Sequence, residues 1–168
     1  MSISMYDASV PVFTQMLNSL VDVLKKAGDY AEVKKIDPGV LIASRLYPDM
    51  LPLSAQVQIA GDTAKGCAAR LAGMEPPVFE DNESSFPELI ARLAKTADYL
   101  KTITRDQVEG SEEKTINYPH HGDSSSMDGL RYLLHRSLPN FFFHVTTAYA
   151  ILRHNGLEIG KADFMGKY

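Results

Sequence analysis

The sequence predicts an all-α protein in which four long helices form a bundle. Residues 1–168 are predicted to be a single domain. Four stretches place apolar residues three and four positions apart, which is the spacing of a helix with one buried face. The length of 168 residues and the hydrophobic fraction of 45% are sufficient for one domain with its own core. Strand patterns are almost absent, so a helical bundle is favoured over a sheet.

The first helix is predicted between Tyr6 and Ala27, with its start near Asp7. Pro11 then lies in the first turns, where few backbone N–H groups are engaged within the helix. An irregular connection containing one short helix follows, because turn residues occupy positions 37–39 and prolines recur near position 50.

The second helix is predicted from Leu53 to Leu71, and Gly73 is placed to adopt the left-handed conformation that ends a helix. Small residues such as Cys67 line its apolar face, which lets a neighbouring helix approach closely. Cys67 has no basic neighbour in the sequence that would lower its pKa, so it is predicted to be a small buried hydrophobe.

The third helix has an explicit start, because Ser85 and Glu88 have the spacing of a capping box. Residues 104–126 form a long polar connection, in which only the stretch 115–118 resembles a strand, paired across His120 to Asp123 as a hairpin. Loops of this length are uncommon in compact domains and often lie near a functional site.

The last helix is predicted to begin near Ser125 or Ser126, with Asp128 completing a second capping box. Gly156 is a suitable end, and Pro139 is expected to kink the helix.

Composition excludes several classes of function. Lys and Arg total 17 against 21 Asp and Glu, a net charge of −4, so nucleic acid is not expected as a partner. No apolar run is long enough for a membrane span, and the start lacks a signal peptide, so we expect a cytoplasmic protein that does not enter the membrane. The single cysteine excludes an intrachain disulfide. No phosphate loop, nucleophile elbow or paired-carboxylate motif is present, which argues against common hydrolases and nucleotide-binding proteins.

The candidate site centres on His144, which a helical projection places inside the apolar arc of the last helix. Asn140 lies one turn earlier, and Gln56 and Thr63 lie at the edge of the apolar stripe of the second helix. A core histidine bonded to a polar neighbour is one interpretation. A mixed metal site of Gln56, Asn140 and His144 is another, and a small polar pocket is a third.

Aromatic side chains also fall outside the inward arc of the last helix: Tyr132, Phe142, Phe143 and Tyr149. Another segment must shield these side chains from solvent. The candidates are the connection around residues 47–53, the C-terminal tail from Leu157 and a second subunit. A homodimer is therefore predicted.

Three stretches carry a resemblance to a known family: residues 5–13 (MYDASVPVF), residues 48–53 (PDMLPL) and residues 138–156, with Asn140-Phe-Phe-Phe-His144 the most specific. They resemble an uncharacterised bacterial domain-of-unknown-function family within the DinB/YfiT-like superfamily. The resemblance covers essentially the whole chain. It implies a four-helix bundle with a long connection before the last helix.

The superfamily resemblance also implies a divalent metal held by three histidines, one on the second helix and two on the last at i, i+4. This sequence departs from that pattern, because Asn140 and His144 occupy the pair and residues 53–71 contain no histidine. One ligand of the three is kept.

Two functions are therefore weighed. In the first, the chain is a DinB-like bundle with a degenerate metal pocket that binds a small-molecule ligand or a partner and needs no cofactor. In the alternative, Gln56, Asn140 and His144 hold a divalent metal such as zinc or nickel, in a metal-dependent enzyme of the thiol-transferase or metal-assisted hydrolase type, by resemblance to superfamily members. A purely structural role, with the pocket filled by side chains, is the third interpretation.

Overall fold

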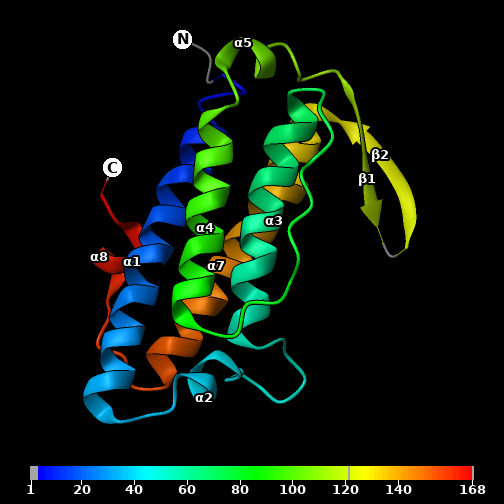
Figure 1. Ribbon diagram of the computed structural model, residues 1–168. Coiled ribbons are helices and arrows are strands. Elements are labelled where there is room, and N and C mark those ends of the chain that lie inside the picture. The colour runs from blue at the N-terminus through cyan, green and yellow to red at the C-terminus, as the bar shows by residue number, and fades with distance from the viewer. Residues whose placement is uncertain (1–3, 121, 168) are drawn as a thin grey trace.

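Four long helices carry the fold, as predicted: α1 (Val10–Lys34), α3 (Leu53–Leu71), α4 (Phe86–Lys101) and α7 (Leu138–His154) (Figure 1). The structure is a computed structural model that describes residues 4–120 and 122–167. The most extensive helix contacts join α1 to α4, α3 to α7 and α3 to α4. The all-α bundle predicted from the sequence is confirmed.

Shorter elements connect the long helices or follow them. They are α2 (Pro38–Ile42), α5 (Arg105–Val108), β1 (Thr115–His120), β2 (Asp123–Asp128), α6 (Gly129–Arg131), the π-helix η1 (Tyr132–Ser137) and α8 (Lys161–Met165). Within the described chain, no helix is long and apolar enough to cross a membrane.

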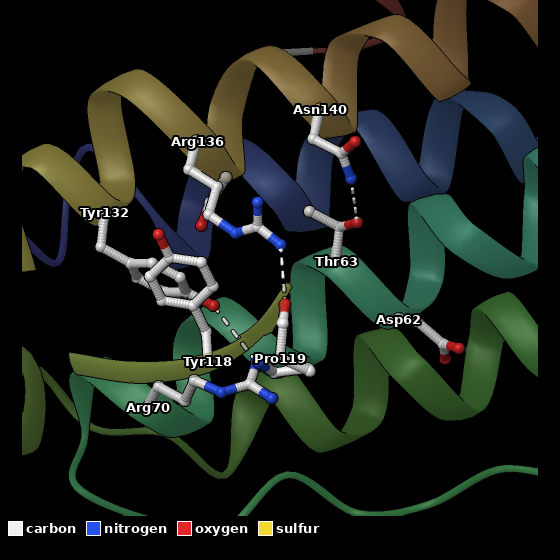
Figure 2. A pocket seen from close by; sticks show the side chains of 9 residues that line it. Asp62, Thr63, Arg70, Tyr118, Pro119, Tyr132, Arg136 and Asn140 are labelled. Atoms are coloured by element: carbon white, nitrogen blue, oxygen red, sulfur yellow. Dashed lines mark hydrogen bonds between the residues drawn. The ribbon is translucent and has the colours of Figure 1, made fainter. Parts of the chain in front are cut away.

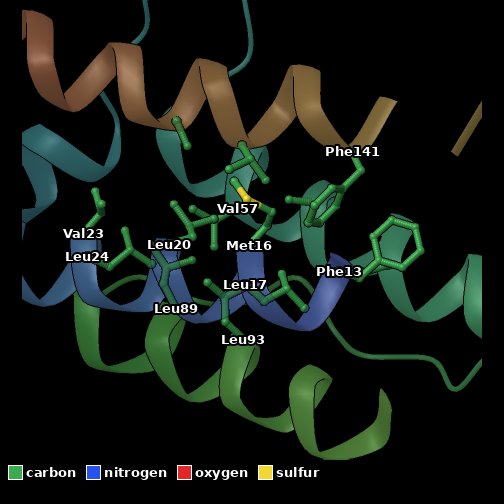
Figure 3. Close-up of a cluster of buried hydrophobic side chains, with 14 of the residues drawn as sticks. Phe13, Met16, Leu17, Leu20, Val23, Leu24, Val57, Leu89, Leu93 and Phe141 are labelled. Atoms are coloured by element: carbon green, nitrogen blue, oxygen red, sulfur yellow. The ribbon is translucent and has the colours of Figure 1, made fainter. Parts of the chain in front are cut away.

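The core lies between the four long helices, where the apolar stripes of the sequence meet (Figure 3). Phe13 of α1 and Phe141 of α7 are fully buried and pack edge to face, with ring centroids 4.9 Å apart. Leu89 and Leu93 of α4 face α1 in the same cluster. Burial of this kind stabilises a domain by about 25 cal/mol per Å² of apolar surface.

Two boundaries of α1 differ from the prediction. The helix begins at Val10 instead of near Asp7, because residues 5–9 form turns, in which the Ser9 N–H bonds to the Tyr6 carbonyl at 3.1 Å. It continues to Lys34, since fully buried Ala31 extends the apolar stripe by one more turn.

The predicted signals at the start of α4 and at the ends of α3 and α7 are confirmed. Ser85 Oγ accepts a hydrogen bond from the Glu88 N–H at 3.3 Å, whereas the Glu88 carboxylate accepts from the N–H of Ser84 at 2.7 Å. Gly73 and Gly156 follow α3 and α7 with φ of 75° and 93°, the left-handed conformation that glycine adopts without strain.

The hairpin is present, but it displaces the predicted start of the last helix. β1 and β2 pair antiparallel from Thr115 opposite Asp128 to His120 opposite Asp123, so residues 124–126 belong to a strand. His121, in the predicted turn, lies outside the described residues. Asp128 is the N-cap, and its carboxylate accepts from the Arg131 N–H at 2.9 Å. The prediction was wrong because pairing with β1 satisfies the backbone of the serine run.

Pro139 is accommodated by a change of helix type. Proline lacks an N–H group and its ring crowds the carbonyl four residues earlier. The π-helix η1, with wider i→i+5 hydrogen bonds, precedes it, and Pro139 occupies the first turn of α7.

Two different segments cover aromatic side chains of the last helix. Tyr149 packs against Phe164 of α8, with ring centroids 5.8 Å apart. The C-terminal tail, one of the three predicted covers, therefore covers this side chain. Tyr132 is covered instead by the hairpin, through Tyr118 at 5.3 Å. Phe143 is 55% exposed.

Candidate functional site

The predicted residues Gln56 and His144 meet in the interface between α3 and α7. His144 Nδ1 lies 2.7 Å from Gln56 Oε1, and both side chains are buried. The Gln56 amide nitrogen donates to the Leu51 carbonyl at 3.1 Å. Because a carbonyl can only accept, this bond directs Oε1 towards the imidazole, and Nδ1 must carry the proton.

The protonation state of His144 follows from its position. Burial lowers its pKa below the usual 6.5, so the ring is neutral at neutral pH. With Nδ1 protonated, the lone pair of the ring is on Nε2.

Asn140, the third predicted residue, makes a different contact. Its amide nitrogen donates to Thr63 Oγ1 at 2.8 Å, and the Asn140 side chain is exposed. The α3–α7 interface therefore contains two polar contacts, Gln56 with His144 and Thr63 with Asn140, which we call the polar seam.

The polar seam does not fit the metal centre that the resemblance implies. Its donors are one imidazole and two carboxamides, and the Gln56 oxygen is already bonded to the His144 Nδ1–H. Among residues 4–120 and 122–167, no three His, Cys, Asp or Glu side chains lie together so that they could hold a metal ion. A site of the three-histidine type requires three converging donors.

Asn140 also lines a cavity of about 220 Å³ between α3, the hairpin and η1, which we call the hairpin cavity (Figure 2). Its walls come from four elements, and every side chain but one is polar or aromatic. They are Asp62, Thr63, Arg70, Tyr118, Pro119, Tyr132, Arg136, Ser137 and Asn140.

Two guanidinium groups of the hairpin cavity donate hydrogen bonds to neutral oxygen atoms. Arg70 Nη1 donates to the Tyr132 hydroxyl at 3.2 Å, and Arg136 Nη2 donates to the Pro119 carbonyl at 3.1 Å (Figure 2). The Arg136 guanidinium also lies over the ring of Tyr118, 4.3 Å from its centroid. Burial raises the pKa of Tyr132, so its hydroxyl stays protonated.

The candidate site predicted from the sequence included Thr63 and Asn140 of this cavity, but not Arg70, Tyr132 or Arg136. Tyr132, Arg136 and Asn140 follow one another at intervals of four, a signal of a shared helix face. Arg70 comes from a distant helix, and no local pattern in the sequence pairs it with them.

Cys67 lies in the same interface and is buried, as predicted. Burial raises the pKa of its thiol to about 12, although hydrogen bonding to the Ser137 side chain acts in the opposite direction. The thiol is therefore protonated at neutral pH and is a poor nucleophile.

Comparison with known proteins assigns the family. The model of a family described as "Domain of unknown function (DUF1993)" matches residues 5–165. The chain belongs to the DUF1993 family. A comparison with functionally curated proteins gives no match.

The DUF1993 chain is also similar to a solved structure, the crystal structure of a DinB family member protein from Shewanella denitrificans. The two share 39% sequence identity with a TM-score of 0.88, over 97% of this chain and 92% of the other. The predicted resemblance to a DinB-like family is confirmed.

The arrangement gives this DUF1993 bundle two chemical features side by side on the α3–α7 interface. The polar seam presents a neutral imidazole of fixed tautomer, and the hairpin cavity presents two oriented cations and hydroxyl groups. Asn140 belongs to both features.

Proposed function

We propose that this DUF1993 protein binds a small polar molecule in the hairpin cavity, on a bundle whose metal pocket is degenerate. The observation that supports the proposal is the convergence of polar side chains from α3, β1, η1 and α7 on one cavity of about 220 Å³. Binding sites typically combine such a preformed hollow with a few oriented polar groups. The volume suits a ligand smaller than drug-sized molecules.

A cavity-filling variant tests this proposal. Asn140 is exposed on α7, so Asn140→Phe places a ring in the cavity without burying it in the core. Thr146→Phe, at an exposed position of the same helix, is the matched control. Ligand-observed NMR with a library of small polar metabolites should give binders to the parent and to Thr146→Phe that are lost in Asn140→Phe. Binders that persist in Asn140→Phe would place binding elsewhere.

A metal-dependent enzyme, of the thiol-transferase or metal-assisted hydrolase type, is the second candidate. The observation that favours it is the hydrogen bond from His144 Nδ1 to Gln56, because metal-ligating histidines usually donate their other N–H to an oxygen. In this candidate, His144 Nε2 and Asn140 would hold zinc or nickel, and Gln56, expected from the sequence to be a third ligand, would orient the imidazole.

Elemental analysis separates the two candidates. We expect tag-free protein to contain far less than one transition metal per chain, even after incubation with zinc, nickel or manganese followed by dialysis. About one metal per chain in the parent, lost in a His144→Ala variant that keeps its circular dichroism spectrum, would instead support the enzyme.

A further inference from the structure

We infer that the hairpin cavity recognises an anionic group, a phosphate or a carboxylate, held between Arg70 and Arg136. This inference rests on the proposed function, since it specifies the chemistry of the molecule bound there. Four features of the cavity support it: the charge of Arg70, the orientation of Arg136, the ion pairs of Asp62 and the volume of the cavity.

Arg70 is a partly buried cation in the last turn of α3. Within the described part of the chain, its side chain makes one hydrogen bond, to the neutral Tyr132 hydroxyl. Among the residues that the structure describes, no carboxylate lies within 4.0 Å of its guanidinium. A guanidinium carries five N–H donors in a planar fork that matches phosphate and carboxylate oxygens. Most donors of Arg70 are therefore available to a ligand.

Arg136 reaches the same cavity from η1 with its orientation already set. The bond to the Pro119 carbonyl and the stacking on Tyr118 hold the guanidinium plane against β1 (Figure 2). An oriented arginine loses less conformational entropy when it binds an anion, which increases the affinity. The hairpin thus positions one of the two cations.

Among the described residues of the cavity wall, Asp62 is the one carboxylate, and it is paired with two cations outside the cavity. Its Oδ1 accepts from Arg92 Nη2 at 2.9 Å and forms an ion pair with Lys65. Because Asp62 is paired with Arg92 and Lys65, which do not line the cavity, its carboxylate does not neutralise the Arg70 guanidinium. The local potential therefore favours a negative ligand.

The size of the cavity and the charge of the chain restrict the anion. A volume of about 220 Å³ admits a small molecule. The chain carries a net charge of −4, so its overall field does not attract an extended polyanion such as nucleic acid. Thr63 and Asn140, at the other end of the wall, supply hydroxyl and amide groups for a neutral polar part of the same molecule.

Titration of the full chain with defined probes tests the inference. Inorganic phosphate and succinate represent the two anion sources, and glycerol is the neutral probe. We expect saturable shifts of backbone amide NMR signals around the cavity with phosphate or succinate. Arg70→Met and Arg136→Met should each weaken this binding at least tenfold. Preference between phosphate and succinate identifies the anionic group.

Matched controls separate specific recognition from general electrostatics and from misfolding. Arg131→Met removes the same charge from an exposed position next to η1 and should change the affinity less than twofold. Arg70→Lys keeps the charge but not the fork, so it should bind more weakly than the parent and more tightly than Arg70→Met. Circular dichroism and thermal unfolding verify that each variant is folded.

Several outcomes would overturn the inference. Equal weakening by Arg131→Met would show a general field, and unchanged affinity in folded Arg70→Met or Arg136→Met would show that these arginines do not bind the anion. Binding of neutral polar molecules in the cavity, with no response to either anion, would overturn the anion specificity and leave the proposed function standing. Absence of binding by any probe or library molecule would overturn both.

Discussion

His144 and Cys67 are both titratable side chains that the fold removes from water, and burial acts on their pKa values in opposite directions. Burial lowers the pKa of His144 and raises that of Cys67 to about 12, because in each case the charged form loses its hydration. Both groups are therefore neutral near pH 7. The Gln56 amide, held by the Leu51 carbonyl, adds a fixed tautomer for His144.

The lowered pKa of His144 makes stability depend on pH. Between the folded pKa and the unfolded value of about 6.5, the unfolded chain binds a proton at His144 that the native protein does not. Stability is therefore fully present above about pH 6.5 and is lost as the pH falls towards the folded pKa. The slope from this one group cannot exceed about 1.4 kcal/mol per pH unit.

Urea unfolding of the parent and of His144→Gln between pH 8 and pH 5 measures this contribution. We expect the parent to lose stability relative to His144→Gln as the pH falls. His154→Gln, at the exposed end of α7, should follow the parent. Parallel curves for the parent and His144→Gln would show that the environment of His144 does not favour the neutral ring.

At the scale of elements, Arg92 attaches the segment between α3 and α4 to both helices. Its side chain is 2% exposed and forms ion pairs with Asp62, Asp81 and Glu83 at 2.9, 2.7 and 2.9 Å. It also donates to the Glu80 carbonyl at 2.7 Å. One arginine thus connects α4, α3 and three acidic residues of the intervening segment.

Replacing Arg92 should lower the free energy of unfolding. Arg92→Met leaves the Glu83 carboxylate, which is 10% exposed, without its cation, and breaking a buried pair in this way typically costs about 3 to 5 kcal/mol. Because Asp62 and Asp81 are more exposed, we expect the lower end, about 3 kcal/mol of unfolding free energy in urea. Lys101→Met, which removes an exposed ion pair with Asp98 on the same helix, should cost less than about 1 kcal/mol. Equal losses would show that Arg92 has no special structural role.

On the scale of the whole molecule, the cover of the last helical segment is incomplete within one chain. α8 covers Tyr149 and the hairpin covers Tyr132, but large apolar side chains stay exposed. Leu130, Leu134 and Phe143 are 43%, 43% and 55% exposed. The homodimer expected from the aromatic residues of this helix stays a prediction, and these side chains are its expected contact surface.

Light scattering coupled to size exclusion tests the dimer. We expect the parent to have twice the monomer mass of 18.6 kDa, and Phe143→Asp to shift to the monomer mass. Val33→Asp makes the same change at a position of α1 that is 78% exposed, and it should stay dimeric. A monomeric parent at concentrations near 100 μM would contradict the prediction.

Local signals in the chain predicted the local structure well. A cap at Ser85, a helix end at Gly73 and a strand around Thr115 were each predicted from the chemistry of a few neighbouring residues. The start of the last helix was predicted too early because the serines at 124–126 satisfy both a cap pattern and a strand. Pairing with residues 117–119 of β1, which lie five to nine positions earlier in the chain, selected the strand.

The sequence by itself determined the helical bundle and its family. Helical periodicity, which places each side chain on a known face, also singled out Gln56, Asn140 and His144 as candidate site residues. Only the tertiary structure decided that Gln56 bonds to His144 while Asn140 bonds to Thr63. It alone brought Arg70 of α3 and Arg136 of η1 to one cavity. The physical reason is that α3, η1 and the hairpin pack together and so bring residues far apart in the chain into one cavity. The pattern within a single helix does not specify which other element packs against it.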